Sequence, residues 1–293
     1  MKNDKSIKVL ITGAGGLTGK TATEYFKTQT NYQIFPLSRQ DLDITDAIAV
    51  QKTISGLQPD FVLNCAAFTQ VDLAEIKKAQ CYAVNVTGVK NLATASHQTG
   101  STLIHLSTDY VFDGAKRSPY SENDPKNPLN YYGLTKSQAE DIIPQLTSRY
   151  FIIRPAWIYG KYGNNFFKLV LKLAEENDVL KISNDQINTP TYARDLVEFI
   201  HFIIQHAQDE YGLYHFSNEG QTTRYEQAKE ILKLLGKSNK IIPVDSSEFN
   251  PIAKRPPYSV LSKAKIKNKW HYPVKHWKES LHTFIKTYYD YKS

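Results

Sequence analysis

The stretch IKVLITGAGGLTGK at residues 7–20 joins an apolar run, a glycine-rich turn and the start of a helix-like segment. Its glycines Gly13, Gly16 and Gly19 are spaced as G-x-x-G-x-x-G. Glycine allows a tight turn and lets the backbone approach a pyrophosphate closely, and the N-terminus of the following helix attracts that anion. Between the first strand and the first helix of an α/β chain, this pattern predicts a dinucleotide site.

The rest of the first half of the chain alternates short apolar runs with segments of helical periodicity. These runs are apolar throughout, which is typical of parallel strands covered on both faces. Strands that alternate with helices predict right-handed βαβ crossovers, so we expect an α/β protein with a doubly wound parallel sheet, the Rossmann fold. The predicted strands are Ile7–Thr12, Gln33–Leu37, Asp60–Asn64, Thr102–Ser107 and Arg149–Arg154, and the predicted helices are Leu17–Lys27, Ala47–Leu57, Lys77–His97 and Tyr132–Leu146.

The second half is less regular and predicts a second, smaller domain. We expect residues 1–158 to form the dinucleotide-binding domain and residues 159–293 a partly interwoven substrate-binding domain, with residues 186–210 packing back on the Rossmann unit. The predicted helices here are Phe166–Glu176, Arg194–Gln208, Tyr225–Leu235 and His276–Tyr289, and the predicted strands are Leu180–Ile182, Leu213–Phe216 and Ile241–Val244.

The composition narrows the class of protein. The net charge of +7 is concentrated between Lys254 and Lys292, where ten Lys/Arg face two Asp/Glu. No nucleic-acid module accompanies these lysines, so we interpret them as a solvated surface and expect no nucleic-acid partner. No apolar run reaches the roughly 20 residues of a membrane helix, so we expect no membrane partner. The two cysteines, Cys65 and Cys81, have neither disulfide-framework nor metal-ligand spacing, which favours a cytoplasmic protein without a metal.

The end of the second predicted strand indicates which dinucleotide binds. An NAD site usually places an acidic residue there for the ribose 2′-hydroxyl. This chain has Ser38 and Arg39 instead, with no acid before Asp41. A hydroxyl and a guanidinium suit a 2′-phosphate, so the sequence predicts NADPH. The alternative is that Arg39 is an exposed loop residue and that NADH is accepted as well.

Tyr132 and Lys136 form a Y-x-x-x-K pair at the start of a predicted helix, where a spacing of four places both side chains on one face. A neighbouring ammonium favours phenolate, so we expect the pKa of Tyr132 to be lowered and its proton to be exchangeable. The hydroxyls of Ser107 and Thr108 end the fourth predicted strand, where side chains face the cofactor crevice of a parallel sheet. This combination is typical of short-chain dehydrogenases.

Six further segments carry a more specific resemblance. They are NCAAFT at 64–69, STDYVF at 107–112, RPAWIYG at 154–160, GNNF at 163–166, DQINTPT at 185–191 and AKRP at 253–256. Together with the glycine turn and the Tyr/Lys pair, these segments resemble the dTDP-4-dehydrorhamnose reductase family, an extended branch of the short-chain dehydrogenases, over nearly the whole chain.

The resemblance implies that the C4 ketone of dTDP-4-dehydro-L-rhamnose is reduced by NADPH or NADH to dTDP-L-rhamnose, a deoxysugar precursor of surface polysaccharide. Tyr132 would donate the proton to the carbonyl oxygen, and Lys136 would hold the cofactor ribose and tune the tyrosine. Thr108, favoured over Ser107, would adjust the pKa of the tyrosine.

The resemblance also assigns binding residues. It places Gly16, Leu17 and Thr18, beside Gly13 and Gly19 of the turn, at the cofactor pyrophosphate; Asp43 and Ile44 at the adenine; Ala67, Phe68 and Thr69 at the ribose side of the cofactor; and Thr108, Asp109 and Trp157 at the sugar. We add Arg255 for the substrate pyrophosphate, because a planar guanidinium binds such an anion through two hydrogen bonds.

Two alternatives stay open at this stage. One keeps the fold and changes the chemistry to a reductase or epimerase acting on another nucleotide sugar. The other is a non-catalytic regulatory subunit with the same fold, since a regulatory subunit of methionine adenosyltransferase resembles this group. The oligomeric state is also open, with a homodimer as one option.

Overall fold

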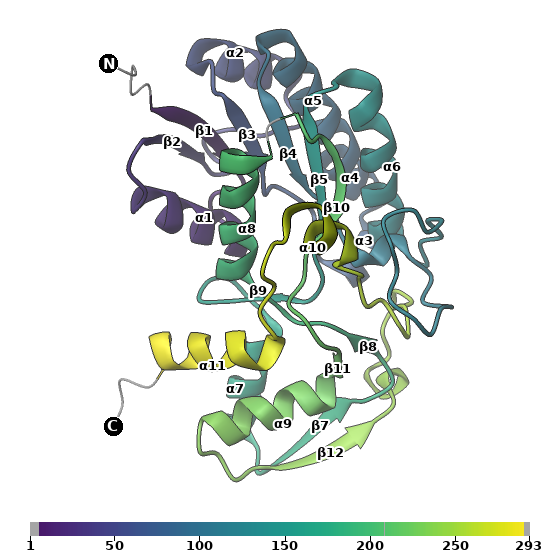
Figure 1. Cartoon of the computed structure of the whole chain (residues 1–293). Helices are drawn as coiled ribbons and strands as arrows, with labels where there is room; N and C mark the ends of the chain where they lie inside the picture. The colour runs from purple at the N-terminus through teal and green to yellow at the C-terminus, as the bar shows by residue number, and fades with distance from the viewer. Residues whose placement is uncertain (1–5, 208, 290–293) are drawn as a thin grey trace.

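The computed structural model describes residues 6–207 and 209–289. Its centre is a parallel sheet in the order β10-β5-β4-β3-β1-β2. The doubly wound α/β fold predicted from the sequence is confirmed (Figure 1). The six strands are β1 (Ile7–Thr12), β2 (Tyr32–Leu37), β3 (Phe61–Asn64), β4 (Thr102–Leu106), β5 (Tyr150–Arg154) and β10 (Gly212–His215).

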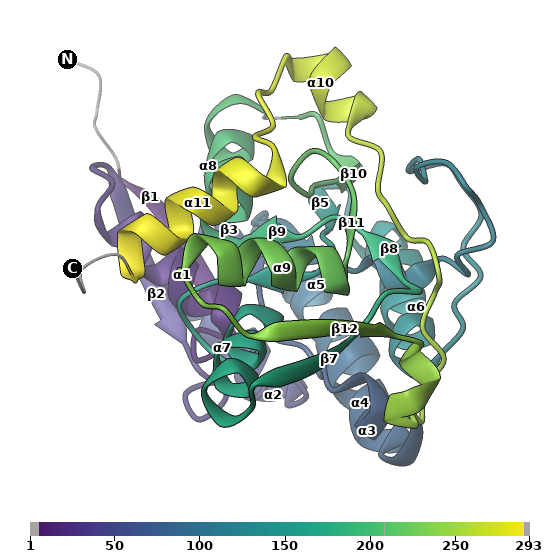
Figure 2. The same cartoon turned by 90° about the horizontal axis from the view of Figure 1, so that it is seen from below.

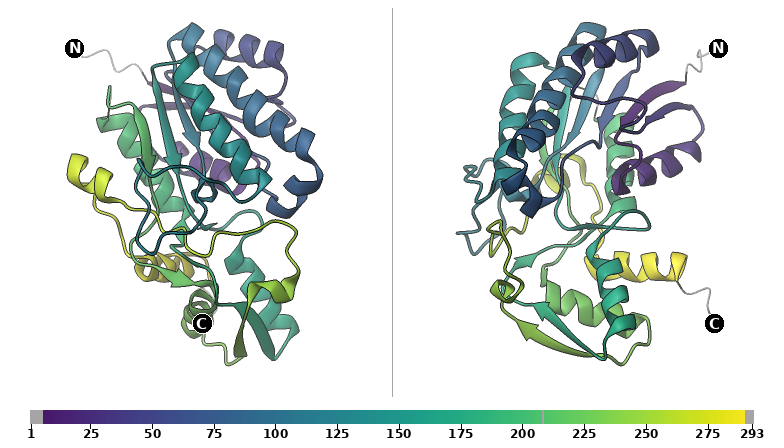
Figure 3. Two further views of the ribbon diagram at one scale, coloured as in Figure 1. Left: turned by 90° about the vertical axis from the view of Figure 1, so that its right-hand side faces the viewer. Right: turned by 180° about the vertical axis from the view of Figure 1, so that it is seen from behind.

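Helices cover both faces of this sheet, which is why its strands are apolar on both sides. In β1, Val9 and Ile11 belong to one core cluster and Leu10 to the other, and all three are fully buried. The first cluster includes residues of α1 (Leu17–Lys27) and α8 (Ala193–His206), and the second includes residues of α2 (Ala47–Leu57), α5 (Gly88–Thr99) and α6 (Tyr131–Leu146). Figure 3 shows the two helix layers on opposite faces.

The predicted helix at 77–97 is confirmed as a continuous helical segment, but it contains a π-helical turn that was not predicted. After α3 (Val71–Ile76), the chain forms α4 (Lys78–Tyr82), a π-helical turn η1 (Ala83–Thr87) and only then α5. The side chain of Asn85 in this turn accepts a hydrogen bond from the Phe68 amide at 2.8 Å and donates one to the Phe68 carbonyl at 3.1 Å. These bonds tie the widened turn to the segment that follows β3, and such π-turns often occur near functional sites.

A second, smaller body lies beyond the carboxyl ends of the sheet strands (Figure 1). The buried apolar residues of its core include Phe167, Leu180, Ile231 and Phe284. Figure 2 shows its strands and helices nearest the viewer. Its elements are α7 (Phe166–Glu176), β7 (Val179–Ser183), α9 (Arg224–Leu234), β12 (Lys240–Val244) and α11 (Trp277–Tyr288), with β7 and β12 paired in parallel.

The remaining elements are short. They are the strands β6 (Ile158–Tyr159), β8 (Ile187–Asn188), β9 (Thr191–Tyr192) and β11 (Thr222–Thr223), the 3-10 turns η2 (Asp109–Val111) and η3 (Ser246–Phe249), and α10 (Ala264–Trp270).

The chain crosses between the two bodies more than once. Helix α8 packs on α1, strand β10 pairs with β5, and α10 packs on β10. The segments that join the sheet body therefore extend past the predicted 186–210. The division at residue 158 itself stays a prediction, and residues 1–5 and 290–293 of it lie outside the described residues. Within residues 6–207 and 209–289, no helix has both the length and the apolar character to cross a bilayer.

Candidate functional site

The glycine turn after β1 forms one side of a cavity of about 260 Å³. Gly13 has a φ of +65°, and a Cβ there would lie 2.5 Å from the amide nitrogen of Ala66. A Cβ on Gly19 would overlap the carbonyl oxygen of Gly13. Gly16 caps α1 without a side-chain hydrogen bond, so the first amides of the helix, at Leu17 and Thr18, are left for an anionic ligand.

Residues predicted to contact the cofactor come from three strand ends around this cavity. The turn after β1 supplies the glycines, the segment after β2 supplies Arg39, Asp43 and Ile44, and the segment after β3 supplies Ala67 and Phe68. Thr69, also predicted, follows Phe68 in the chain but is not among the lining residues.

The hydroxyl predicted for the 2′-phosphate is already engaged. The side chain of Asp41 accepts hydrogen bonds from the Ser38 hydroxyl at 2.6 Å and from the Ser38 amide at 2.8 Å, and these bonds lower the pKa of Asp41. Arg39 is 71% exposed, with its Nε 3.6 Å from the carboxylate of Asp43. The structure therefore leaves the guanidinium of Arg39 as the accessible cationic group at this edge, with Asp41 beside it.

Tyr132 lies in the first turn of α6, which begins after Asn130, whose side chain accepts from the Gly133 amide at 2.8 Å. The ring of Tyr132 meets that of Tyr110 edge-on, with centroids 5.9 Å apart. Burial raises the pKa of Tyr132, while a hydrogen bond with Thr108 acts in the opposite direction. The expected lowering of this pKa by Lys136 is wrong for the protein without its ligands, because burial dominates.

Lys136 is turned toward the sheet. It is 1% exposed, and its Nζ donates to the carbonyl oxygen of Leu106 at 2.6 Å and lies 3.0 Å from Nε2 of His105. Burial lowers the pKa of Lys136 to about 8. The side chain of Lys136, which was expected to lie beside the phenol of Tyr132, thus forms its hydrogen bonds with the end of β4.

A row of hydrogen bonds connects Lys136, through His105, to β3 and β1. Thr12, Asn64 and His105 stand side by side in the register of β1, β3 and β4. The amide of Ala66 and the hydroxyl of Thr12 both donate to Oδ1 of Asn64, at 3.0 and 2.7 Å. Because Oδ1 of Asn64 accepts these two bonds, its side-chain nitrogen Nδ2 faces Nδ1 of His105 at 3.0 Å and donates to it.

The donor from Asn64 leaves the ring proton of neutral His105 on Nε2, which points at Lys136. Nζ of Lys136 can accept a hydrogen bond from this N–H only when the amine is uncharged, because an ammonium has no free electron pair. The row thus favours the neutral form of Lys136, in the same direction as burial.

The structure separates the two hydroxyls at the end of β4. Ser107 donates to Oε1 of Glu140 at 2.5 Å, and Glu140 also accepts two hydrogen bonds from the buried Arg154 at 2.8 and 2.6 Å. Ser107 thus completes a structural ion pair. Thr108 caps η2, where its hydroxyl accepts from the Tyr110 amide, and it acts to lower the pKa of Tyr132. The catalytic role of Thr108 stays a prediction.

Asp109, predicted to meet the sugar, is held by the protein itself. Its Oδ2 accepts from Asn188 and from Ser259, each at 2.7 Å, and Thr108 donates to Oδ1 at 3.2 Å. Burial raises the pKa of Asp109 to about 6. Its carboxylate therefore joins η2 to β8 and to the segment around Ser259, and only part of it is available to a ligand.

Arg255, predicted for the substrate pyrophosphate, is also engaged. It donates to both oxygens of Asp72, at 3.2 and 2.6 Å, and to the carbonyl of Ala253 at 3.0 Å. Its side chain borders a second cavity of about 300 Å³ that Tyr110, Phe166 and Arg224 also line.

Arg224 is a residue that the sequence analysis missed. Its guanidinium lies 3.6 Å from the centroid of the Trp157 ring and 4.5 Å from that of Phe166. Trp157 itself has a φ of +43°, a conformation that non-glycine residues adopt at a cost of roughly 1–3 kcal/mol and that is often found in functional sites. No sequence motif marks Arg224, because its partners come from distant segments.

Comparison with known families gives one result over almost the whole chain. Residues 7–290 match the family described as the RmlD substrate binding domain. Spore coat polysaccharide biosynthesis protein SpsK of Bacillus subtilis is 38% identical, over 95% of this chain and 96% of the relative. The dTDP-4-dehydrorhamnose reductase of Aggregatibacter actinomycetemcomitans is 36% identical, over 94% of this chain and 97% of that protein.

Solved structures give the same picture. The dTDP-4-dehydrorhamnose reductase of Bacillus anthracis, in complex with NADP, is similar with a TM-score of 0.92 and 36% identity, covering 96% of this chain and 99% of that one. A dTDP-4-dehydrorhamnose reductase from Clostridium acetobutylicum has the same TM-score and coverage at 39% identity. The UDP-glucose 4-epimerase of Thermus thermophilus, at 17% identity and a TM-score of 0.79 over 96% of this chain and 98% of that one, shares the fold.

Proposed function

We propose, from the premise that this chain belongs to the family of the RmlD substrate binding domain, that it reduces the C4 ketone of dTDP-4-dehydro-L-rhamnose with NADPH to give dTDP-L-rhamnose. One observation supports this most directly. Tyr132 shares an apolar cluster with Phe68, which lines the cavity of the glycine turn, and with Tyr110, which lines the second cavity. The phenol therefore stands where a cofactor in one cavity would meet a substrate in the other.

The glycine turn fits a dinucleotide, because its tightest positions leave no space for a Cβ and the start of α1 has no side-chain cap. NADPH held there supplies the hydride. In our proposal the amides after Gly16 bind the pyrophosphate, Arg39 faces the 2′-phosphate and Lys136 binds the ribose.

Tyr132 acts as the proton donor in this proposal. A pKa raised by burial keeps the phenol protonated at neutral pH, which is the form that a reduction requires. Thr108 bonds to the phenol and orients it. As hydride reaches C4, the proton of Tyr132 passes to the carbonyl oxygen, and the negative charge that would otherwise develop there is neutralised.

The test is to supply the purified protein with dTDP-4-dehydro-L-rhamnose and NADPH and to follow the absorbance of the reduced nicotinamide. Stoichiometric consumption is the expected result. The same assay with dTDP-4-keto-6-deoxy-D-glucose serves as the control, because one relative, from Streptomyces niveus and 33% identical, is named as a reductase of that sugar. No consumption, or faster consumption with the control sugar, would contradict the proposal.

A cofactor assay separates reduction from epimerisation. An epimerase must keep its cofactor through the cycle, whereas a reductase releases the oxidised cofactor and binds a new reduced one. We expect the protein to lose its cofactor on dialysis and to require added NADPH for every turnover. Catalysis of several turnovers without added NADPH would favour an epimerase.

A further inference from the structure

Arg224 is the first residue of α9, and its guanidinium lies against two aromatic rings, those of Trp157 and Phe166. These contacts with the rings leave its five N–H donors to be satisfied by other groups. One donor reaches Oε1 of Gln227 at 3.1 Å. Within residues 6–207 and 209–289, the guanidinium forms no ion pair; the carboxylate of Asp109 acts on its pKa only through space.

The other arginine of the cavity is in the opposite state. Arg255 is neutralised by the carboxylate of Asp72, which accepts two hydrogen bonds from its guanidinium, the shorter at 2.6 Å. Burial and the nearby Arg255 both lower the pKa of Arg224, to about 10. A partly buried cation that lacks a carboxylate partner is costly unless an anion joins it. Arg224 is thus the cationic group of this cavity that is prepared for an anionic ligand.

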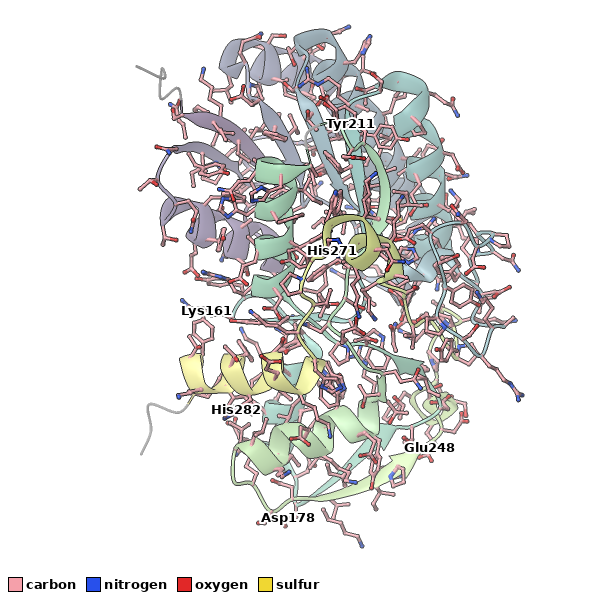
Figure 4. All side chains as sticks on the ribbon, in the orientation of Figure 1. Lys161, Asp178, Tyr211, Glu248, His271 and His282 are labelled. Carbon is pink, nitrogen blue, oxygen red and sulfur yellow. The ribbon has the colours of Figure 1, made fainter. Side chains whose placement is uncertain are left out.

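The lining of this cavity combines charged and apolar side chains. Tyr110, in contact with Tyr132, and the two arginines contribute to the lining, as do Phe166, Leu169 and Phe249. Leu169 and Phe249 are 49% and 55% exposed, which is unusual for large apolar side chains and leaves apolar surface for a ligand. Lys181 also lines the cavity, and its ammonium pairs with the carboxylate of Glu248 at 3.0 Å. Glu248 is labelled in Figure 4, close to β12.

We infer that Arg224 binds the diphosphate of a nucleoside-diphosphate sugar and that Phe166, Leu169 and Phe249 contact its base. This inference rests on the proposed function, because it takes the sugar to lie at Tyr132. A proton donor, a cation and an apolar surface then match the sugar, the diphosphate and the base of one ligand. Trp157 serves as the support that orients Arg224, and Arg255 fastens its own loop to Asp72.

The experiment measures binding of dTDP, thymidine and NADPH by titration calorimetry to the wild-type protein and to Arg224→Gln. The variant should bind dTDP roughly ten- to a hundredfold more weakly, the range expected when charge-assisted contacts to an anion are lost. Its affinity for thymidine and NADPH should stay unchanged. Arg224→Lys should fall between the two proteins, because it keeps the charge but loses the planar donors.

Lys229→Gln is the matched control. It removes one positive charge from the same helix, but Lys229 is exposed and paired with Glu226. This variant should bind dTDP like the wild-type protein. A dTDP affinity of Arg224→Gln within twofold of wild type, in a variant with an unchanged unfolding temperature, would overturn the inference.

The outcomes also separate this inference from the proposed function. Normal turnover of dTDP-4-dehydro-L-rhamnose together with undiminished dTDP binding by Arg224→Gln would contradict the diphosphate site alone. Absence of turnover in the wild-type protein, with dTDP binding that depends on Arg224, would contradict the proposed reaction and leave the diphosphate site supported.

Discussion

The two cavities near Tyr132, one lined by Phe68 and the other by Tyr110, are built in different ways. The cavity at the glycine turn is formed mainly by residues that follow β1, β2 and β3, so each of its walls lies next to a strand end. The second cavity is lined by side chains from distant segments, among them Arg224 and the pair of Asp72 and Arg255, which are 183 residues apart. The first cavity depends on space for the backbone, and the second depends on charges that long-range folding brings together.

Because one cavity depends on space and the other on charge, different substitutions should affect each of them. Changes that add volume to the glycine turn should impair cofactor binding and leave the nucleotide-sugar side intact. Changes of charge in the second cavity should do the reverse. Only a change at Tyr132, which packs with Phe68 of the first cavity and Tyr110 of the second, should stop catalysis while both ligands still bind.

The largest effect is expected for Tyr132→Phe. The change removes the proton donor and keeps the ring that packs on Tyr110, so kcat should fall roughly 10²–10⁴-fold. Steady-state kinetics with NADPH, together with titrations of NADPH and dTDP, provide the measurement. Both dissociation constants should stay near wild type. A variant that keeps most of its activity would contradict the role given to the phenol.

Gly13→Ala should act on one cavity only. The added Cβ would meet the Ala66 backbone at a positive φ, so NADPH should bind roughly tenfold or more weakly, and dTDP should bind normally. Gly56→Ala, in α2, is the control, since a Cβ there meets nothing within 4 Å. Equal loss of NADPH and dTDP binding would show that the two cavities are not independent.

A smaller effect is expected for Arg39→Asp. The change should weaken NADPH by about tenfold relative to NADH, because it removes the exposed cation from the 2′-phosphate and adds a repelling carboxylate. The ratio of kcat/KM for the two cofactors is the measurement. An equal effect on both cofactors would remove Arg39 from the 2′-phosphate site.

The smallest effect concerns pH. With the pKa of Lys136 lowered to about 8, kcat/KM for NADPH should decline as the pH rises through 8, where the charged amine is lost. His105→Asn removes the ring N–H that faces Lys136, so this decline should move to higher pH, by a fraction of a unit or more. Glu140, Cys65, Cys81 and Tyr132 also lie near the amine and remain in place. An unmoved profile would contradict the hydrogen-bond row.

Features that depend on local sequence could be predicted, and features that depend on long-range contacts could not. Helices α1 and α2 have the predicted bounds, and the parallel sheet follows from runs that are apolar throughout. The π-turn at Asn85 was not predicted, because its cause is a pair of hydrogen bonds to Phe68 rather than any local preference.

The substrate side was harder to predict for the same physical reason. The residue types at Asp109 and Arg255 suggest ligand contacts, but whether a charged group is free depends on what the fold brings to it. Asn188, Ser259 and Asp72 all come from elsewhere in the chain. Arg224 has no motif, and its importance appears only once Trp157 lies beneath it.

The most direct test of the central claim follows a labelled hydride. The protein is given dTDP-4-dehydro-L-rhamnose and NADPH that carries deuterium at its transferable position, and the product is examined by mass spectrometry and NMR. The account predicts dTDP-L-rhamnose with one deuterium, bound to C4 of the sugar. A product without deuterium, or with deuterium at another carbon, would contradict it.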